Sequence, residues 1–308
     1  MPITPTTKIW MNGKLVDWDR ATVHFLTPTL HYGWGVFEGA RAYPTSRGPA
    51  VFRLGDHVAR LFRSARIYLM DIPFTAEDIV AATKETIRAN DVEECYVRHL
   101  VYLGYGEMGL NPLPSKVEVG IAVWPWGAYL GKEAQEKGCR AAVSSWQRIG
   151  PNTIPPAGKA VGQYINSSLA KVSALKAGYD EAILCTPTGT VAEGSGENLF
   201  LVVDRQLVTP PLVDGVLPGV TRDSVMTIAR DQGYDVVERS LVRSDLYLAD
   251  EAFFTGTAAE VVPIASIDDR RIGAGVPGPV TRELMRLYKQ AAHGELDRYK
   301  DWVEPVAD

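Results

Sequence analysis

The chain has 308 residues, 46% of them hydrophobic and 22% charged, which is typical of a soluble globular protein with room for two hydrophobic cores. Its formal net charge is −5, and Lys and Arg are scattered along it, which argues against a nucleic-acid partner. The sequence has no apolar run long enough to cross a bilayer, no CxxC pair among its three Cys residues and no metal-ligand spacing among its five His residues, so we expect no membrane span, disulfide framework or metal site.

The amino-terminal half predicts strands followed by helices and then further strands, an α+β arrangement. Asn12-Gly13 lies between two short apolar runs and predicts a tight hairpin over residues 8–16. We expect Asp56 to cap one helix and Thr75 to begin another, because apolar residues at helical spacing follow each of them. Residues 95–103 and 117–124 are rich in strand-forming side chains. The first ten residues carry no export signal, so we expect a cytoplasmic protein.

The carboxy-terminal half predicts a second, mixed α/β sheet. Pro and Gly residues followed by a charged run at residues 124–137 should interrupt regular pairing. We therefore expect a small α+β domain over residues 1–123, an interdomain loop over 124–137 and a large mixed-sheet domain over 138–308. Within the large domain we expect strands at residues 140–145, 181–185 and 198–203 and near Val236 and Phe253, helices at 163–177 and 221–232, and a polar tail after Gly294.

Lys159 is the first candidate for chemistry. It lies between Gly158 and Ala160, just after Pro155-Pro156, so its surroundings are small and stiff. A lysine that condenses with an aldehyde needs access and partial burial, which lowers the pKa of its amine. A lysine taken at random is most often a solvated surface residue, so the neighbouring motifs decide its interpretation.

Two acids in a glycine-rich loop form a second candidate. Glu193 and Glu197 bracket Gly194 and Gly196 directly before an apolar strand. A pyridine ring that withdraws electrons needs a buried carboxylate opposite its nitrogen, and Glu197, beside the strand, is the better placed of the two. The alternative is a turn whose acids face water.

A third stretch is suited to binding an anion. Pro218-Gly219 leads into the helix expected from Thr221, and the free N–H groups at a helix amino end attract phosphate. Thr257 offers a further hydroxyl and Arg60 a guanidinium. Each signal is weak alone, because such residues often serve only as caps or face solvent.

Together and in this order, these stretches resemble the branched-chain amino acid aminotransferases among the fold-type IV pyridoxal-phosphate enzymes. The resemblance covers most of the chain and includes HYGWGVFEGAR (31–41), FRLGDHVARL (52–61), YVR (96–98), GYGEMGLNP (104–112), PNTIPPAGKA (151–160), EGSGENLF (193–200), LPGVTRDSV (217–225) and YLADEAFFTGTAAE (247–260). It implies a two-domain fold-type IV aminotransferase fold with pyridoxal 5'-phosphate as cofactor.

The resemblance assigns roles to these residues. Lys159 would bond the cofactor aldehyde and move the proton in the transfer, Tyr164 would meet the cofactor's phenolic oxygen, and Glu197 would pair with its ring nitrogen, with Glu193 beside it. Cofactor contacts, the phosphate among them, would come from Arg60, Leu217, Gly219, Val220, Thr221, Gly256 and Thr257. Substrate contacts would come from Tyr32, Phe37, Gly39, Tyr96, Arg98, Leu110, Trp126, Tyr129, Thr257 and Ala258. No metal is implied.

The implied substrates are leucine, isoleucine and valine, with 2-oxoglutarate as acceptor. Arg98 would bind the distal carboxylate of glutamate, and one hydrophobic pocket should accept all three side chains. Tyr32 and the loop of Met108–Leu110 would come from a partner subunit, so the resemblance implies a homodimer, with a hexamer as a further option. His99 and Trp34 depart from the family pattern and are expected to reshape the pocket.

Other functions compete with this interpretation. Within the same fold, a D-amino-acid or (R)-amine aminotransferase or an aminodeoxychorismate lyase would keep Lys159 and the acids, whereas Tyr96-Val97-Arg98 and GYGEMGLNP favour the branched-chain group. From a different class, a non-enzymatic binding scaffold would use the glycine-rich loops only as turns. Consumption of L-leucine rather than D-alanine would distinguish a branched-chain aminotransferase from the other enzymes of this fold. A protein that binds no pyridoxal phosphate would indicate the binding scaffold.

Overall fold

The computed structural model describes residues 3–127 and 130–307. The chain divides into two compact units, each built from separate stretches. Unit 1 contains residues 1–126, 158–163 and 290–308, and unit 2 contains residues 127–157 and 164–289. The short stretch 158–163, which carries Lys159, therefore belongs with the amino-terminal residues although it follows them by some thirty positions.

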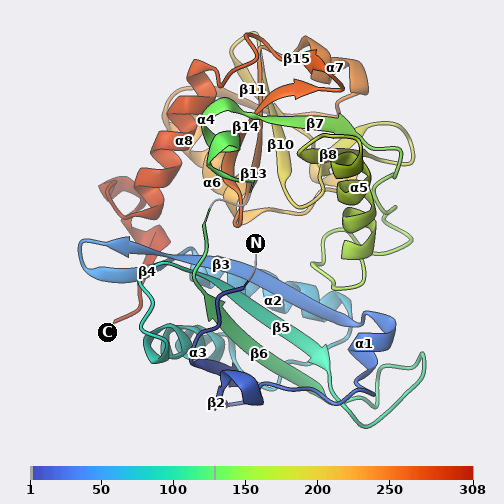
Figure 1. Ribbon diagram of the computed structural model, residues 1–308, viewed down its shortest axis with the longest axis vertical. Coiled ribbons are helices and arrows are strands. Elements are labelled where there is room, and N and C mark those ends of the chain that lie inside the picture. Colours follow the sequence, from blue (N-terminus) through green and yellow to red (C-terminus); the bar gives the residue numbers. More distant parts are fainter. Residues whose placement is uncertain (1–2, 128–129, 308) are drawn as a thin grey trace. The chain divides into compact units, whose positions relative to one another are not determined.

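Unit 1 is built on a sheet of seven strands in the order β16-β4-β3-β5-β6-β1-β2. Figure 1 shows β3, β5 and β6 side by side in this sheet. Its strands are β1 (Lys8–Met11), β2 (Lys14–Asp17), β3 (Gly35–Thr45), β4 (Gly48–Phe52), β5 (Cys95–Leu103), β6 (Val117–Trp124) and β16 (Val303–Pro305). Its helices are η1 (Trp18–Arg20), α1 (Pro28–Tyr32), α2 (Leu54–Ile67), α3 (Ala76–Ala89) and η3 (Asp297–Trp302). Helices α2 and α3 pack on one face of this sheet, where alternate strand residues such as Val36, Ala40, Val97 and Val101 form the core with them.

The predicted hairpin and the second predicted helix start are confirmed. Asn12 and Gly13 both have positive φ, 50° and 92°, as a two-residue hairpin between β1 and β2 requires. Thr75 caps α3 in a capping box with Asp78. The predicted cap of α2 is wrong: that helix begins at Leu54, after Arg53, and Asp56 pairs with the Arg53 side chain at 2.6 Å.

Unit 2 is built on a nine-stranded mixed sheet, as far as its described residues show, with eight strands in the order β12-β11-β10-β13-β14-β7-β8-β9 and β15 beside β14. Its strands are β7 (Cys139–Val143), β8 (Glu181–Cys185), β9 (Val191–Gly194), β10 (Asn198–Val203), β11 (Gln206–Thr209), β12 (Asp235–Glu238), β13 (Glu251–Gly256), β14 (Glu260–Ile267) and β15 (Arg270–Arg271). Its helices are α4 (Lys132–Lys137), α5 (Tyr164–Lys176), η2 (Leu212–Asp214), α6 (Val220–Asp231) and α7 (Arg243–Leu248); α8 (Pro279–Ala292) contains the last boundary between the units.

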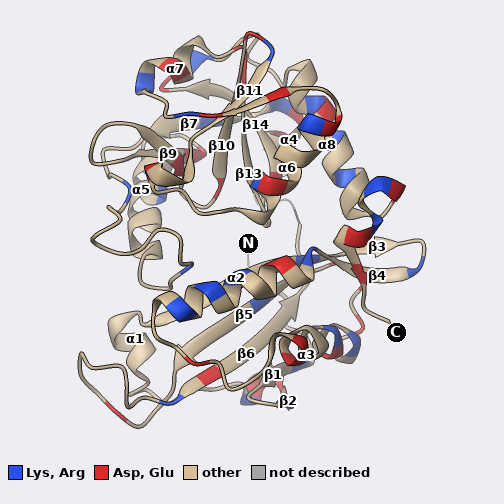
Figure 2. Cartoon of the chain, turned by 180° about the vertical axis from the view of Figure 1, so that it is seen from behind, with Lys and Arg blue, Asp and Glu red and all other residues tan. Residues whose placement is uncertain are grey.

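Several predicted elements of unit 2 are confirmed and two expectations are wrong. The strands β8 and β10 have the predicted bounds, and α5 and α6 lie within one residue of theirs. Strand pairing ends at Trp124, as predicted for the segment 124–137, but this segment, expected to be an interdomain loop, contains the short helix α4. The stretch after Gly294 is not a polar tail: it forms η3 and then β16, which pairs with β4 in unit 1. Lys, Arg, Asp and Glu are spread over both units (Figure 2), as the scattered sequence pattern predicts.

Candidate active site

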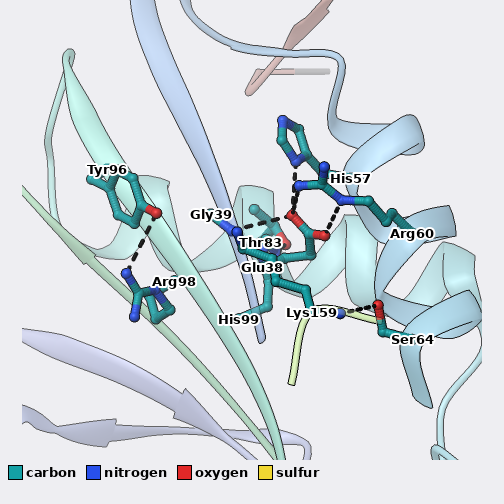
Figure 3. Close-up of polar contacts among 10 residues, drawn as sticks. All are labelled: Glu38, Gly39, His57, Arg60, Ser64, Thr83, Tyr96, Arg98, His99 and Lys159. Carbon is teal, nitrogen blue, oxygen red and sulfur yellow. Dashed lines mark hydrogen bonds and ion pairs between the residues drawn. The ribbon is translucent and has the colours of Figure 1, made fainter. Parts of the chain in front are cut away.

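The backbone around Lys159 is fixed to unit 1 on both sides. The Lys159 carbonyl accepts a hydrogen bond from the Phe37 N–H at 3.0 Å, and the Lys159 N–H donates to the Ser64 hydroxyl on α2 at 3.0 Å (Figure 3). Two residues on, the Val161 N–H donates to the Gly35 carbonyl at 2.8 Å. The segment therefore extends the edge of β3 locally and holds Lys159 in one place.

The side chain of Lys159 is half-buried, and the pKa of its amine is lowered. Its Nζ lies 5.0 Å from the centre of the Phe37 ring, a cation–π contact. Loss of hydration on burial, followed by the positive charge of Arg60, lowers the pKa of Lys159 from 10.5 to about 8. A larger share of the amine is therefore unprotonated near neutral pH, as a nucleophilic lysine requires.

Arg60, predicted to bind phosphate, is buried in α2 and has a partner that the sequence did not predict. Its Nε donates to Glu38 Oε1 at 2.6 Å and its Nη2 to Glu38 Oε2 at 2.8 Å. His57 also donates, through Nδ1, to Glu38 Oε2 at 2.9 Å. Glu38, on β3 within HYGWGVFEGAR, thus belongs to the candidate site.

The predicted substrate residues of β3 and β5 form a cluster in unit 1. The Arg98 guanidinium lies 4.6 Å from the Phe37 ring centre and 5.3 Å from that of Tyr96. Arg98 Nη2 donates to the Tyr96 hydroxyl at 3.4 Å, while its buried Nε has no hydrogen-bond partner among the described residues. Gly39 is required here, because a Cβ at this position would overlap the Tyr96 hydroxyl. A cationic group with an unused buried donor is suited to binding a carboxylate.

The remaining predicted substrate residues of unit 1 lie in different surroundings. The ring centre of Trp126 is 5.0 Å from that of Tyr96. Tyr32 on α1 and Leu110 in the loop after β5 are exposed, Leu110 at 86%. Tyr129 lies outside the described residues.

The expectation that His99 and Trp34 reshape the substrate pocket is not supported by their positions. His99 pairs across the strands with Glu38 and lies on the helix-facing side of the sheet, where its Nε2 is 2.8 Å from the Thr83 hydroxyl of α3. Trp34 packs beside the core of unit 1 and donates through Nε1 to the Tyr68 carbonyl at 3.1 Å. Because side chains alternate along a strand, His99 points away from the face of Tyr96 and Arg98.

Glu193, on β9 in unit 2, is a buried carboxylate with three donors. Arg148 Nη2 lies 2.8 Å from Oε1, and the Asn198 amide and the Leu217 N–H donate to Oε2 at 2.9 and 3.0 Å. These contacts favour the ionised carboxylate. Sequence reasoning assigned no role to Arg148 or Asn198, although Asn198 lies in the stretch EGSGENLF.

Glu197 lies at the start of β10, buried and in a different electrostatic environment. Burial, followed by the negative charge of Glu181, raises the pKa of Glu197 from 4.5 to about 8. Its Oε2 accepts a hydrogen bond from the Gly196 N–H at 3.1 Å. The raised pKa favours the neutral acid for Glu197, whereas the donors around Glu193 favour a carboxylate.

The predicted anion-binding stretch of unit 2 is a tight turn before α6. Gly219 is the N-cap residue, and a Cβ there would overlap the Asn198 amide oxygen, so the turn needs glycine. Thr221 is buried in the first turn of α6, which packs against β13. At the end of β13, Thr257, Ala258 and Ala259 form the three-residue loop to β14, and the buried Thr255 hydroxyl lacks a partner among the described residues. Glycine backbone, helix N–H groups and hydroxyls are a donor set for phosphate.

The predicted site residues thus fall into two groups, one in each unit. Unit 1 holds Tyr32, Phe37, Gly39, Arg60, Tyr96, Arg98, Leu110, Trp126 and Lys159. Unit 2 holds Tyr164 at the start of α5, Glu193, Glu197, Leu217, Gly219, Val220, Thr221, Gly256, Thr257 and Ala258. Within residues 3–127 and 130–307 no group of acids, His and Cys is arranged to hold a metal ion, and no helix is long and apolar enough to span a membrane.

Comparison with known proteins identifies the class to which this fold and these residues belong. Residues 35–267 match the family Amino-transferase class IV. Among curated proteins, the chain is 47% identical over 294 residues to the branched-chain-amino-acid aminotransferase of Pseudomonas aeruginosa, covering 96% of this chain and 95% of that protein. It is 44% identical over 299 residues to that of Escherichia coli, covering 97% of each.

Solved structures show the same likeness. A crystal structure of the Escherichia coli branched-chain amino acid aminotransferase matches with a TM-score of 0.96 and 43% identity, over 98% of this chain and 100% of that one. The branched-chain amino acid aminotransferase of Thermobaculum terrenum, in its PLP-form, matches with a TM-score of 0.93 and 37% identity, over 98% and 99%. The chain belongs to the class IV aminotransferase family. Its fold is the two-domain fold-type IV fold that the sequence predicts.

Proposed function

We propose that this protein is a pyridoxal-phosphate-dependent aminotransferase that exchanges the amino group between the branched-chain L-amino acids and 2-oxoglutarate. The observation that carries this proposal is Lys159, a lysine held by its backbone on both sides with an amine whose pKa is lowered to about 8. The relatives at 41–47% identity, matched over most of their length, are named for this activity. The alternative activities on the same fold are not favoured by these relatives.

The residues present fit the cofactor. Its aldehyde calls for a lysine, its ring nitrogen for a carboxylate and its phosphate for N–H groups and hydroxyls. Lys159, Glu193, the Gly219–Thr221 turn and the unpartnered Thr255 hydroxyl supply these groups. When bound, the cofactor supplies a carbonyl that takes the amino group and a ring that withdraws electrons. Tyr164, Glu197, Leu217, Gly256 and Thr257 remain proposed cofactor contacts, as does Arg60 for the phosphate.

Residues of this chain bind the substrate and transfer its α-proton. Lys159 Nζ, unprotonated in part at neutral pH, would accept the proton from the α-carbon of the amino acid and donate it, within the same half of the exchange, to the carbon of the cofactor's carbonyl group, so that the lysine ends each half in its starting state. Arg98, with its unused Nε donor, binds a carboxylate of glutamate or 2-oxoglutarate. The rings of Phe37, Tyr96 and Trp126 provide an apolar surface for an aliphatic side chain.

Transamination of L-leucine tests the proposed function directly. With pyridoxal phosphate and 2-oxoglutarate present, the purified protein should form glutamate, measured enzymatically, and Lys159→Ala should abolish this because no other amine replaces Nζ. Lys84→Ala, which changes a lysine of α3, is the matched control and should leave turnover unchanged. Turnover of D-alanine or an (R)-amine without any turnover of L-leucine would refute the assignment.

The geometry leads us to propose Glu193, rather than Glu197 as the sequence favoured, as the partner of the ring nitrogen. A protonated ring nitrogen needs an anion, and the contacts of Glu193 favour one whereas the raised pKa of Glu197 does not. We expect Glu193→Gln to lower kcat by about 100-fold or more, and Glu197→Gln, which keeps a neutral group, by less than about 10-fold. Equal losses in steady-state assays would contradict this order.

We also propose that the active unit is a homodimer in which Tyr32 and the loop carrying Leu110 complete the partner's site. The support is the exposure of large apolar side chains in this part of unit 1, including Phe25, Leu30 and Leu110. A hexamer and a cytoplasmic location stay predictions from the sequence.

A further inference from the structure

Glu38 is a carboxylate buried where the strand pattern calls for an apolar residue. It lies on β3 between Val36 and Ala40, which point to the same face of the sheet and belong to the core with α2 and α3. Its side chain is 0% exposed. Removing a carboxylate from water is strongly unfavourable unless other charges and hydrogen bonds compensate it.

Four donors compensate the Glu38 carboxylate. Arg60 donates from Nε to Oε1 and from Nη2 to Oε2, at 2.6 and 2.8 Å. Oε2 also accepts from His57 Nδ1 at 2.9 Å and from the Gly39 N–H at 3.2 Å (Figure 3). Burial acts to raise the pKa of Glu38, but the charge and hydrogen bonds of Arg60 hold it well below its usual range. The Glu38 carboxylate is thus ionised and holds the Arg60 guanidinium by two parallel hydrogen bonds.

The same two elements that carry this pair also hold Lys159. Phe37, next to Glu38 on β3, donates its N–H to the Lys159 carbonyl, and Ser64, one helical turn beyond Arg60 on α2, accepts from the Lys159 N–H. Neighbouring positions of one strand and one helix therefore connect the buried ion pair to the lysine.

We propose that Glu38 is a positioning residue of the active site, which fixes the Arg60 guanidinium and balances the positive charge that Arg60 places beside Lys159. Only the catalytic role of Lys159 in this proposal rests on the proposed function. The effect of the Glu38 and Arg60 charges on the Lys159 amine does not depend on which reaction the protein catalyses.

The groups that act on the Lys159 amine come from three elements. Arg60 and His57 lie on α2, Glu38 on β3, and Tyr96 and Arg98 on β5. After burial, Arg60 lowers the pKa of Lys159 most, and Glu38 acts against it. Removing the Glu38 charge should therefore lower the Lys159 pKa further, whereas removing the Arg60 charge should raise it.

The opposite signs of these two effects provide the test. The full-length protein, freed of cofactor, is treated with an amine-acylating reagent over a pH series, and modification of the peptide that contains Lys159 is measured by mass spectrometry. Against the wild type at pH 7, we expect the rate to increase about threefold or more in Glu38→Gln and to decrease by a similar factor in Arg60→Gln. Glu94→Gln, which removes the partner of Arg41 in the 2.7 Å ion pair of the same sheet, is the matched control and should not change the rate.

A merely structural role for Glu38 predicts a different pattern. Both variants would then change the rate in the same direction or not at all, and either result would overturn the proposal. If Glu38→Gln does not fold, the double variant Glu38→Gln/Arg60→Gln replaces the ion pair by two amides; its Lys159 pH midpoint should lie above that of the wild type, and an unchanged midpoint would count against the proposal. Leucine turnover of the wild type, measured separately, tests the proposed function, so the two ideas can fail independently.

Discussion

The half-buried Lys159 and the buried Glu38 are the two residues of unit 1 on which the proposed chemistry depends. Burial and the charge of Arg60 lower the pKa of Lys159, the proposed nucleophile, and the charge of Glu38 limits that effect. The sequence supported Lys159 through its small, stiff neighbours, since these predict access and burial. It could not indicate Glu38, because a single acid in a strand pattern is usually assigned to the solvent side. Only its ion pair with Arg60, between β3 and α2, leads to the role proposed for Glu38.

At the same scale, His99 should make stability depend on pH. Burial lowers the pKa of His99 from 6.5 to about 4, so the folded protein takes up this proton at a lower pH than the unfolded chain does. The stability held above pH 6.5 is then lost as pH falls from 6.5 toward 4, by about 2 kcal/mol at pH 5. Urea unfolding of the wild type and of His99→Gln at pH 8 and pH 5 measures this contribution.

The His99 variant isolates one group among several that titrate. His57 also has a pKa lowered by burial, and it remains in both proteins. The loss of stability between pH 8 and pH 5 should therefore be smaller in His99→Gln, not absent. An equal loss in the two proteins would show that His99 is not protonated on unfolding in this range.

At the scale of elements, local signals predicted what local energies determine. The Asn12-Gly13 turn and the Thr75 cap are stabilised within a few residues of themselves, so their patterns were sufficient. The predicted start of α2 was wrong because the Asp56 side chain forms an ion pair with Arg53 and does not cap the helix. Arg53 itself has a left-handed φ of 51°. β16 was missed because three residues form a strand only where β4 offers its edge.

The site also shows this difference between elements. The Gly219 turn before α6 was predicted from its own residues, whereas its contact with Asn198 and the contact of Asn198 with Glu193 link three separate elements. The choice between Glu193 and Glu197 depends on Arg148 and Glu181, which are distant in sequence. A local sequence pattern cannot predict contacts between residues that are distant in the sequence.

At the scale of the whole molecule, we propose that a partner subunit completes the active site. Leu110→Asp should abolish leucine turnover without unfolding the chain, because Leu110 is 86% exposed in the single chain and is proposed to complete the partner's site. Lys159→Ala should be inactive as well. Mixed, unfolded and refolded together in equal amounts, the two variants should recover about a quarter of wild-type turnover, since half of the dimers would contain one intact site.

This complementation distinguishes the proposal from its alternative. If Leu110 acts within its own chain, every mixed dimer lacks an intact site and activity stays absent. Leu248→Asp, at an exposed leucine of unit 2, is the control and should stay active alone.

Ordered motifs and periodicity along the chain were sufficient to predict the family, to select Lys159 as the candidate nucleophile and to place most strands and helices. Only the folded chain shows that residues 158–163 join unit 1, that Arg60 pairs with Glu38, and that the His99 side chain faces α3, away from Tyr96 and Arg98. The physical reason is that charge, burial and hydrogen bonding act through space. A side chain's pKa and partners depend on residues that only folding brings near.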